Sequence, residues 1–243
     1  MTLLRSLVYV VWLYGSMAAV GISFFPFALF SEKAATEAAR AWCAALVWGL
    51  RVICGAHVEV RGQQYIPQGA ALVAAKHQSM LDTITPFAIL RNPSIVLKKE
   101  LLKLPIFGWF AVQSGMIPID REAHASALRA MLKAARDRIA KGRKVLIFPE
   151  GTRQALGAPP DYKPGVAALY RDLKLPCTPV AVSTGVVWPA HGVVRRPGTA
   201  VIEFLPPIPA GLSREDFMAA LEEKIETASN ALLEEARRNG AKA

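Results

Sequence analysis

Apolar residues are distributed along this chain in two different patterns. Up to about residue 56 they form long runs, and from residue 58 they form short runs separated by charged and turn-forming residues. Short β-branched runs bounded by turns predict strands, and apolar positions that recur every three or four residues predict helices. The second pattern therefore predicts strands and helices in alternation, which is typical of an α/β domain.

This alternation predicts the secondary structure of most of the domain. We expect strands near residues 57–61, 71–76, 94–98, 115–119, 144–148, 178–183 and 200–204. We expect helices near residues 80–91, 99–112, 123–141, 164–172 and 213–238. Because the sequence shows no internal repeat and no long linker, we expect one α/β domain over residues 57–243, with a mixed, mostly parallel sheet flanked by helices.

The first apolar run is long enough to reach across a membrane. No charged residue lies between Arg5 and Glu32, and the uninterrupted helical part, residues 7–25, has a length of about 19 residues, near the lower limit for a span. Pro26 should break or kink a helix at this point. A cleaved signal peptide is the alternative, although its apolar region would be unusually long and aromatic.

A second apolar segment follows and ends near residue 56. Arg40 and Arg51 interrupt it, and the stretch between them is too short to cross a bilayer. It reads as an interfacial helix with Trp42 and Trp48 as anchors, and a buried core helix is the alternative. We expect residues 1–56 to form a membrane anchor of two helices, either monotopic or with a single span.

The net charge of the chain indicates which class of molecule it binds. The chain has 29 Lys and Arg against 19 Asp and Glu, a formal net charge of +10, and 53% of its residues are hydrophobic. This balance favours an anionic partner: a nucleic acid, anionic lipid headgroups or a phosphorylated substrate. The basic residues are scattered among apolar ones without a stacking or zinc-finger motif, so we expect no nucleic acid. The three cysteines lie at no useful spacing and predict neither disulfides nor a metal site.

The stretch "VAAKHQSMLDTITPF" (73–87) is the first candidate for chemistry. It places His77 five residues before Asp82, on the turn between a predicted strand and a helix. A carboxylate within reach of an imidazole fixes its tautomer and stabilises its protonated form. The alternative is structural, because Ser79 and Asp82 also have the spacing of a capping box.

The stretch "KVLIFPEGTR" is the second candidate. Glu150, Gly151, Thr152 and Arg153 follow the end of a predicted strand. A guanidinium, a hydroxyl and free backbone N–H groups in one small loop suit a phosphate monoester. A turn with a surface ion pair is the alternative.

Other polar groups end predicted strands, and each has an ordinary structural explanation. Arg121 ends "GMIPIDR", Lys98 ends the strand near residues 94–98, and both would be solvated by default. Pro176 and Pro179, in "LPCTPVAVSTG", make the entrance of a strand rigid. The sequence has no G-x-S-x-G, G-x-G-x-x-G, Walker, H-E-x-x-H or C-x-x-C motif, which argues against a serine hydrolase, a dehydrogenase, a nucleotide-driven enzyme and a zinc enzyme.

Taken together and in this order, "KHQSMLD", "GMIPIDR", "FPEGTR" and "PCTPVAV" resemble the four sequence blocks of the glycerolipid acyltransferases, over about residues 57–205. The likeness is greatest to bacterial members that acylate 1-acylglycerol 3-phosphate. The chain departs from the family pattern at two places, and these departures affect the prediction of the exact lysolipid more than that of the reaction. Many members have Asn where this chain has Lys76, and an aromatic residue is frequent in the second block, which here reads Met-Ile-Pro-Ile.

The resemblance implies a role for each block. His77 would be the general base that deprotonates the hydroxyl of the acceptor, and Asp82 would orient it. The acceptor would be bound by Arg121 together with four residues of the third block: Glu150, Gly151, Thr152 and Arg153. Lys98 and Lys163 would be further phosphate ligands, and the strand with Pro179 would shape the acyl-donor side.

The implied activity is transfer of an acyl group to the sn-2 hydroxyl of 1-acylglycerol 3-phosphate, giving phosphatidate. Acyl-CoA or acyl carrier protein would supply the acyl group as a thioester co-substrate, with no cofactor and no metal. The implied place is the bacterial inner membrane, with the catalytic domain facing the cytoplasm. The alternatives are an acyltransferase for glycerol 3-phosphate or a lyso-aminolipid, a non-catalytic lipid-binding membrane protein of the same fold, and a hydrolase of lysolipids or thioesters.

Overall fold

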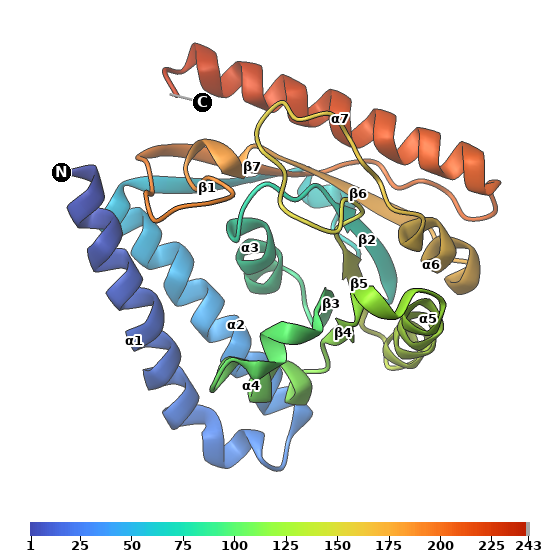
Figure 1. Cartoon of the computed structure of the whole chain (residues 1–243), viewed down its shortest axis with the longest axis horizontal. Coiled ribbons are helices and arrows are strands. Elements are labelled where there is room, and N and C mark those ends of the chain that lie inside the picture. The colour runs from blue at the N-terminus through green and yellow to red at the C-terminus, as the bar shows by residue number, and fades with distance from the viewer. Residues whose placement is uncertain (242–243) are drawn as a thin grey trace.

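The computed structural model describes residues 1–241 and is built around one seven-stranded sheet (Figure 1). The strand order is β1-β7-β6-β2-β5-β3-β4. All neighbouring strands run parallel except β6 and β7, which are antiparallel, so the sheet is mixed and mostly parallel as predicted. The strands are β1 (Ala56–Arg61), β2 (Ala71–Ala75), β3 (Pro93–Lys98), β4 (Ile117–Ile119), β5 (Lys144–Ile147), β6 (Cys177–Val182) and β7 (Gly198–Phe204).

Seven α-helices accompany the sheet in the described part of the chain. They are α1 (Thr2–Ala28), α2 (Glu32–Gly49), α3 (Leu81–Ile89), α4 (Phe107–Gln113), α5 (His124–Ala140), α6 (Gly165–Leu173) and α7 (Arg214–Arg238). A π-helical turn, η1 (Leu50–Cys54), extends α2 toward β1. Single 3-10 turns are η2 (Gln63–Tyr65), η3 (Lys99–Lys103), η4 (Arg121–Ala123) and η5 (Thr184–Val186).

Proline has different effects in two of the predicted helices. The expected helix over residues 99–112 is divided into η3 and α4 at Pro105, where Ile106 takes a positive φ of 62°. Proline lacks the N–H that a continuous helix would need there. Pro26, in contrast, does not end the first helix, which continues to Ala28. The proline lies so close to the helix end that only the last turn follows it.

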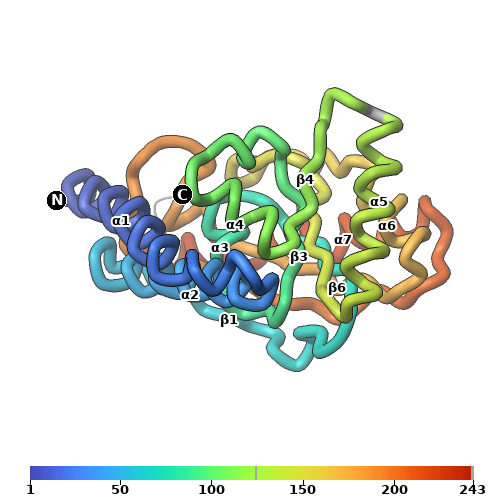
Figure 2. The backbone as a smooth tube through the Cα atoms, turned by 90° about the horizontal axis from the view of Figure 1, so that it is seen from below, coloured from blue at the N-terminus to red at the C-terminus, as the bar shows by residue number. Residues whose placement is uncertain are grey.

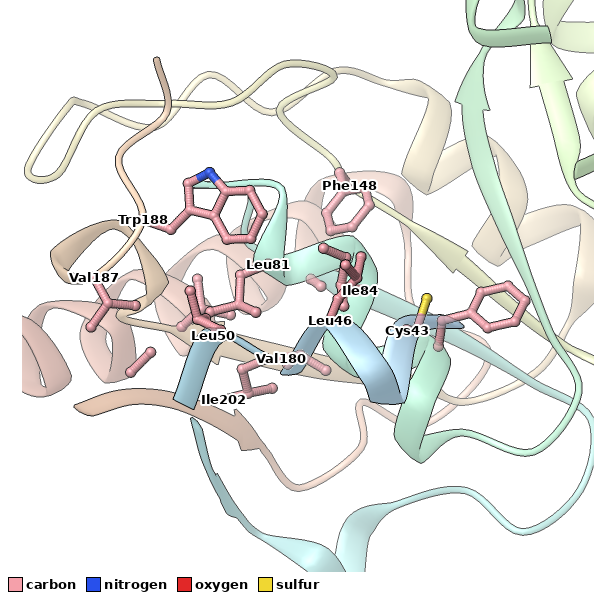
Figure 3. Close-up of a cluster of buried hydrophobic side chains, with 14 of the residues drawn as sticks. Cys43, Leu46, Leu50, Leu81, Ile84, Phe148, Val180, Val187, Trp188 and Ile202 are labelled. Atoms are coloured by element: carbon pink, nitrogen blue, oxygen red, sulfur yellow. The ribbon is translucent and has the colours of Figure 1, made fainter. Parts of the chain in front are cut away.

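The sheet separates two apolar cores because side chains alternate along each strand. In β2, Val73 and Ala75 face one core, while Leu72 and Ala74 face the other. Helices α2 and α3 cover the first core, which also contains Leu46, Leu50, Leu81, Ile84, Val180 and Ile202 (Figure 3). Helices α5, α6 and α7 cover the second core.

The N-terminal helices form an antiparallel hairpin along one edge of the molecule, as Figures 1 and 2 both show. One face of α1 is buried, and its residues recur every three or four positions: Ser6, Tyr9, Leu13 and Ser16. The opposite face leaves large apolar side chains exposed: Leu3, Leu4, Leu7, Val8, Val11, Tyr14, Ile22, Phe25 and Phe27. Helix α1 is also long and apolar enough to cross a membrane.

Candidate active site

The candidate residues are brought together because three neighbouring strands are parallel. β5, β2 and β6 lie side by side, so their carboxyl ends meet at one edge of the sheet. The loop after β2 carries His77, the loop after β5 carries Glu150, and the turn after β6 carries Thr184. Ligands of open α/β sheets bind at the carboxyl edge of the strands, so this edge is the candidate active site.

His77 and Asp82 form the contact that the sequence suggested. The imidazole Nδ1 lies 3.2 Å from Asp82 Oδ2, the side chain of His77 is 15% exposed, and Asp82 is fully buried. The backbone N–H groups of Gln78 and Ser79 also donate to Asp82 Oδ2, at 2.5 and 2.7 Å. The turn before α3 therefore wraps around the carboxylate and fixes it against the histidine.

The capping interpretation holds only in part. The Ser79 N–H donates to Asp82, which is one half of a capping box. The other half is different, because the Ser79 hydroxyl accepts from the Leu81 N–H at 3.0 Å and not from Asp82. Capping and orientation of His77 are thus served by the same carboxylate.

Thr184 completes the surroundings of Asp82. Its hydroxyl donates a short hydrogen bond to Asp82 Oδ1, and the threonine is fully buried. The Thr184 hydroxyl and the two backbone N–H groups all donate hydrogen bonds to Asp82. A carboxylate can accept all three, and these bonds compensate for the loss of water around the buried side chain. With Nδ1–H donating to Asp82, the neutral tautomer of His77 has its lone pair on Nε2.

Phe148 sets the plane of the imidazole. The two rings are stacked, with centroids 4.1 Å apart and 20° between their planes. Within residues 1–241, no hydrogen-bond partner of Nε2 is described. His77 is therefore held by its Nδ1 atom and one ring face, while Nε2 is available to a substrate proton.

Glu150 lies behind His77. It is 1% exposed; its Oε2 accepts from the His77 backbone N–H at 2.7 Å, and its Oε1 lies 3.1 Å from Lys76 Nζ. Burial raises the pKa of the Glu150 carboxyl, and the ammonium of Lys76 acts in the opposite direction. Both of its oxygens are already bonded within the protein.

The other residues of the third block lie on the surface. Gly151 has a φ of +70°, a value that favours glycine, and Thr152 and Arg153 are exposed. Arg153 donates to the Ala190 carbonyl at 3.0 Å. Lys163 lies beside Gly151 and pairs with Asp161 at 2.5 Å.

The remaining predicted residues lie on either side of this centre. Arg121 is exposed just after β4, three strand positions from β2, and Lys98 is exposed at the end of β3. At ~4.8 Å per strand, β4 is roughly 14 Å from β2. Pro179 is buried in β6 opposite Ala74. No cluster of metal-ligating side chains occurs among the residues that the structure describes.

Comparisons with known proteins identify the family of this chain. A family model described as Acyltransferase matches residues 57–183, from the start of the sheet to the end of β6. The chain belongs to this acyltransferase family. A 1-acyl-sn-glycerol-3-phosphate acyltransferase from Pseudomonas aeruginosa is 39% identical over 158 residues, which cover 65% of this chain and 62% of that enzyme. The enzyme of the same name from Saccharomyces cerevisiae is 30% identical, over 72% of this chain and 59% of the relative.

The chain thus matches less than two thirds of the length of these relatives. The fold itself is shared more completely. The crystal structure of the 1-acyl-sn-glycerophosphate (LPA) acyltransferase PlsC from Thermotoga maritima superposes with a TM-score of 0.79 and 21% identity. The superposition covers 96% of this chain and 98% of that chain, so it includes the N-terminal hairpin.

Sequence reasoning missed three residues near the candidate centre. Thr184 lies one residue beyond the family match, in the "STG" that follows β6, a stretch noted only for its prolines. Tyr162 and Glu226 were not singled out at all. The carboxyl-edge rule could have indicated Thr184, because β6 neighbours β2, but that neighbour relation is not visible in the sequence.

Proposed function

We propose that the protein is a membrane-bound O-acyltransferase that converts 1-acylglycerol 3-phosphate into phosphatidate. The observation that carries the proposal is the His77 imidazole, bonded through Nδ1 to the buried Asp82 and open at Nε2. This is the arrangement of a general base with its orienting carboxylate. The relatives from Pseudomonas aeruginosa and Saccharomyces cerevisiae are both named as 1-acyl-sn-glycerol-3-phosphate acyltransferases, which supports this choice of substrate.

The reaction is a direct transfer. The lone pair of His77 Nε2 takes the proton of the sn-2 hydroxyl as the hydroxyl oxygen attacks the thioester carbonyl carbon. The carbon–sulfur bond then breaks, and the thiolate leaves with the proton that His77 returns. Positioned base catalysis contributes about 10²- to 10⁴-fold in rate, and holding the two substrates in reach contributes more.

No acyl-enzyme intermediate is needed. The three free cysteines, Cys43, Cys54 and Cys177, are all buried. Burial raises the pKa of the Cys177 thiol, which makes it a poor nucleophile. The acceptor hydroxyl is then the nucleophile that His77 activates.

Exposed cations at the carboxyl edge of the sheet would bind the phosphate of the acceptor. Arg153, Lys163 and Gly151 lie in the loops next to His77, and Arg121 and Lys98 lie farther along the same edge. A phosphate monoester at this edge would pair with the guanidinium groups, which bind it bidentately. The thioester donor, acyl-CoA or acyl carrier protein, is itself anionic and would be attracted by the net charge of +10.

The hairpin of residues 1–56 is proposed as a monotopic anchor. The amino-terminal part of α1 is held against the catalytic domain: the Arg195 N–H donates to the Ser6 hydroxyl at 2.8 Å, and Tyr9 packs edge-on against Trp188. A single span would have to pull this part of α1 away from those contacts. A hairpin whose exposed apolar face lies in one leaflet keeps them intact. It also leaves the catalytic domain on the cytoplasmic side of the inner membrane, where acyl thioesters are found.

The test is an acyl-transfer assay with the purified full-length protein. A radiolabelled acyl-CoA or acyl carrier protein is supplied with lysophosphatidate, glycerol 3-phosphate, a lyso-ornithine lipid or water alone as acceptor. We expect labelled phosphatidate from lysophosphatidate at a rate well above the other acceptors. Label in another lipid would change the acceptor, free fatty acid would indicate a hydrolase, and no turnover with any acceptor would favour a lipid-binding protein.

A further inference from the structure

A buried ionic network joins the C-terminal helix to the catalytic loop. Lys76 Nζ lies 2.7 and 2.8 Å from the two carboxylate oxygens of Glu226, on α7, and 3.1 Å from Glu150. The side chain of Lys76 is 4% exposed, that of Glu150 is fully buried and that of Glu226 is 16% exposed. The Tyr162 hydroxyl donates to Glu226 at 2.8 Å.

The contacts run in series toward the histidine. Tyr162 and Lys76 hold Glu226, Lys76 also holds Glu150, and Glu150 accepts from the His77 backbone N–H at 2.7 Å. The His77 carbonyl accepts from the Gln154 N–H at 2.8 Å. The backbone of His77 is therefore fixed on both sides, independently of the Asp82 contact that fixes its ring.

The network combines two carboxylates with one ammonium. Burial raises the pKa of the Tyr162 hydroxyl, and the Glu226 carboxylate adds to this effect, so tyrosine remains a neutral donor to the second carboxylate. A buried ion pair contributes little net stability, because the loss of hydration offsets the attraction. The clearest consequence of this network is geometric: Glu226 holds Lys76, and Lys76 holds Glu150 against the His77 N–H.

We propose that Glu226 and Lys76 are positioning residues, which keep His77 in its reactive place through Glu150. Glu226 lies outside the residues 57–183 that match the family. The C-terminal helix is thereby part of the catalytic apparatus of this chain. The inference rests on the acyl transfer proposed for His77.

The test compares Glu226→Gln, Tyr162→Phe and Lys76→Met with the wild-type enzyme. Glu223→Gln is the matched control, because it makes the same change at an exposed position of the same helix. Steady-state kcat and KM are measured for lysophosphatidate and for the acyl thioester. Thermal unfolding of each variant fixes an assay temperature at which it is fully folded.

We expect Glu226→Gln to lower kcat roughly 10- to 100-fold, because a shift of about 1 Å in a catalytic group can cost 10²-fold. KM for both substrates should change less than about twofold, and Tyr162→Phe should lower kcat by a smaller factor, since one contact of Glu226 is lost. Lys76→Met combined with Glu226→Gln should lower kcat less than the product of the single effects, because both act through one network.

Two results would overturn the inference. One is a folded Glu226→Gln enzyme that has the kcat of the wild type, and this result is decisive whether or not Lys76→Met lowers kcat. The other is an effect confined to the KM of the acceptor, which would place Glu226 in the binding site. Inactive wild-type enzyme would instead refute the proposed function, so the two failures are distinguishable.

Discussion

Two regions of this molecule reverse the usual distribution of side chains. Beneath the carboxyl edge of the sheet, Asp82, Glu150, Lys76 and Thr184 are polar and buried. On the outer face of α1 the reverse holds, since large side chains such as Leu7 and Val11 are apolar and exposed. Buried polar groups and exposed apolar surface are both unfavourable in water unless they have partners. The first region finds its partners within the protein, and the second requires a partner outside it.

The difference between them suits the action on a lipid that we propose for this small domain. The proposed catalytic groups, His77 and Asp82, are each hydrogen-bonded within the fold before any substrate arrives. Most of the large side chains on the apolar face are exposed, although Phe25 also packs against Trp109, and this face is available to a bilayer. We therefore expect changes beneath the edge to affect the rate of chemistry, and changes on the exposed surfaces to affect binding.

The largest expected effect is that of His77→Ala. It removes the proposed general base, so acyl transfer should fall by roughly 10²- to 10⁴-fold or to background. Folding should be preserved, since His77 is partly exposed and lies on a turn. Circular dichroism and vesicle binding serve as controls, and a folded variant that kept more than a few per cent of the activity would exclude His77 as the base.

Arg153→Ala tests whether the exposed cations bind the substrate phosphate. Its only described protein contact is with the Ala190 carbonyl, so the guanidinium can turn to a substrate phosphate. We expect the KM for lysophosphatidate to rise about tenfold or more, while the KM for the acyl thioester changes little. Arg121→Ala should act in the same direction. Equal effects on both substrates would place these arginines in a structural role.

Replacing apolar residues of α1 tests the second region. Leu7→Gln combined with Val11→Gln removes two side chains that are 47% and 73% exposed. If each contributes about 1 kcal/mol to lipid burial, vesicle binding should weaken by roughly tenfold or more. Activity on detergent-dispersed acceptor should remain.

Leu128→Gln, on α5, is the matched control, because Leu128 is also an exposed leucine (37%) but lies away from the hairpin. Vesicle sedimentation provides the measurement. Equal weakening in the control, or none in the α1 variant, would contradict an anchor on this face. A separate check is impermeant labelling of a single cysteine at residue 2 in intact cells, since labelling from outside would require a span.

The smallest effect concerns the attachment of the hairpin. Glu32, at the start of α2, binds Lys141 at 2.8 Å and the buried Arg143 at 2.5 Å. The hydrogen bond from Lys141, with the nearby charge of Arg143, holds the pKa of the Glu32 carboxyl below its ordinary value. A lowered folded pKa stabilises the protein above the ordinary carboxyl pKa, and this contribution is lost as the pH falls through the folded value.

Glu32→Gln should therefore lower the Tm at pH 7 by about 2–4 °C, and the difference should shrink toward pH 3. Glu37→Gln, on the same helix with a weaker partner at 4.0 Å, is the control. Thermal scans in detergent at the two pH values give the comparison. A difference that persisted at low pH would mean that packing, not charge, holds the hairpin.

The sequence predicted most of the fold because strands carry a local signal. The predicted strands lie within two residues of the observed ones at either end, since short β-branched runs and turn residues mark them. The division of residues 99–112 was also foreseeable, because Pro105 lies within that range. The packing of helices around the hairpin could not be predicted from the sequence, because it depends on tertiary contacts.

The site was predictable only where its residues are close in the sequence. His77 and Asp82 are five residues apart, and their contact follows from the turn between β2 and α3. Thr184 lies 102 residues from Asp82, and Glu226 lies 150 residues from Lys76. Those pairs meet because of strand order and the placement of α7, and no periodic pattern in the sequence encodes either one.

We expect buried partners beneath the carboxyl edge of the sheet, and not the exposed cations, to set the rate of the chemical step. Thr184→Val tests it most directly, because it removes one hydroxyl from Asp82, preserves the shape of the side chain and touches no exposed surface. Steady-state kinetics on lysophosphatidate should show kcat lowered by about tenfold, with the KM of both substrates unchanged. Wild-type kcat in a folded Thr184→Val enzyme, or a change confined to KM, would contradict the account.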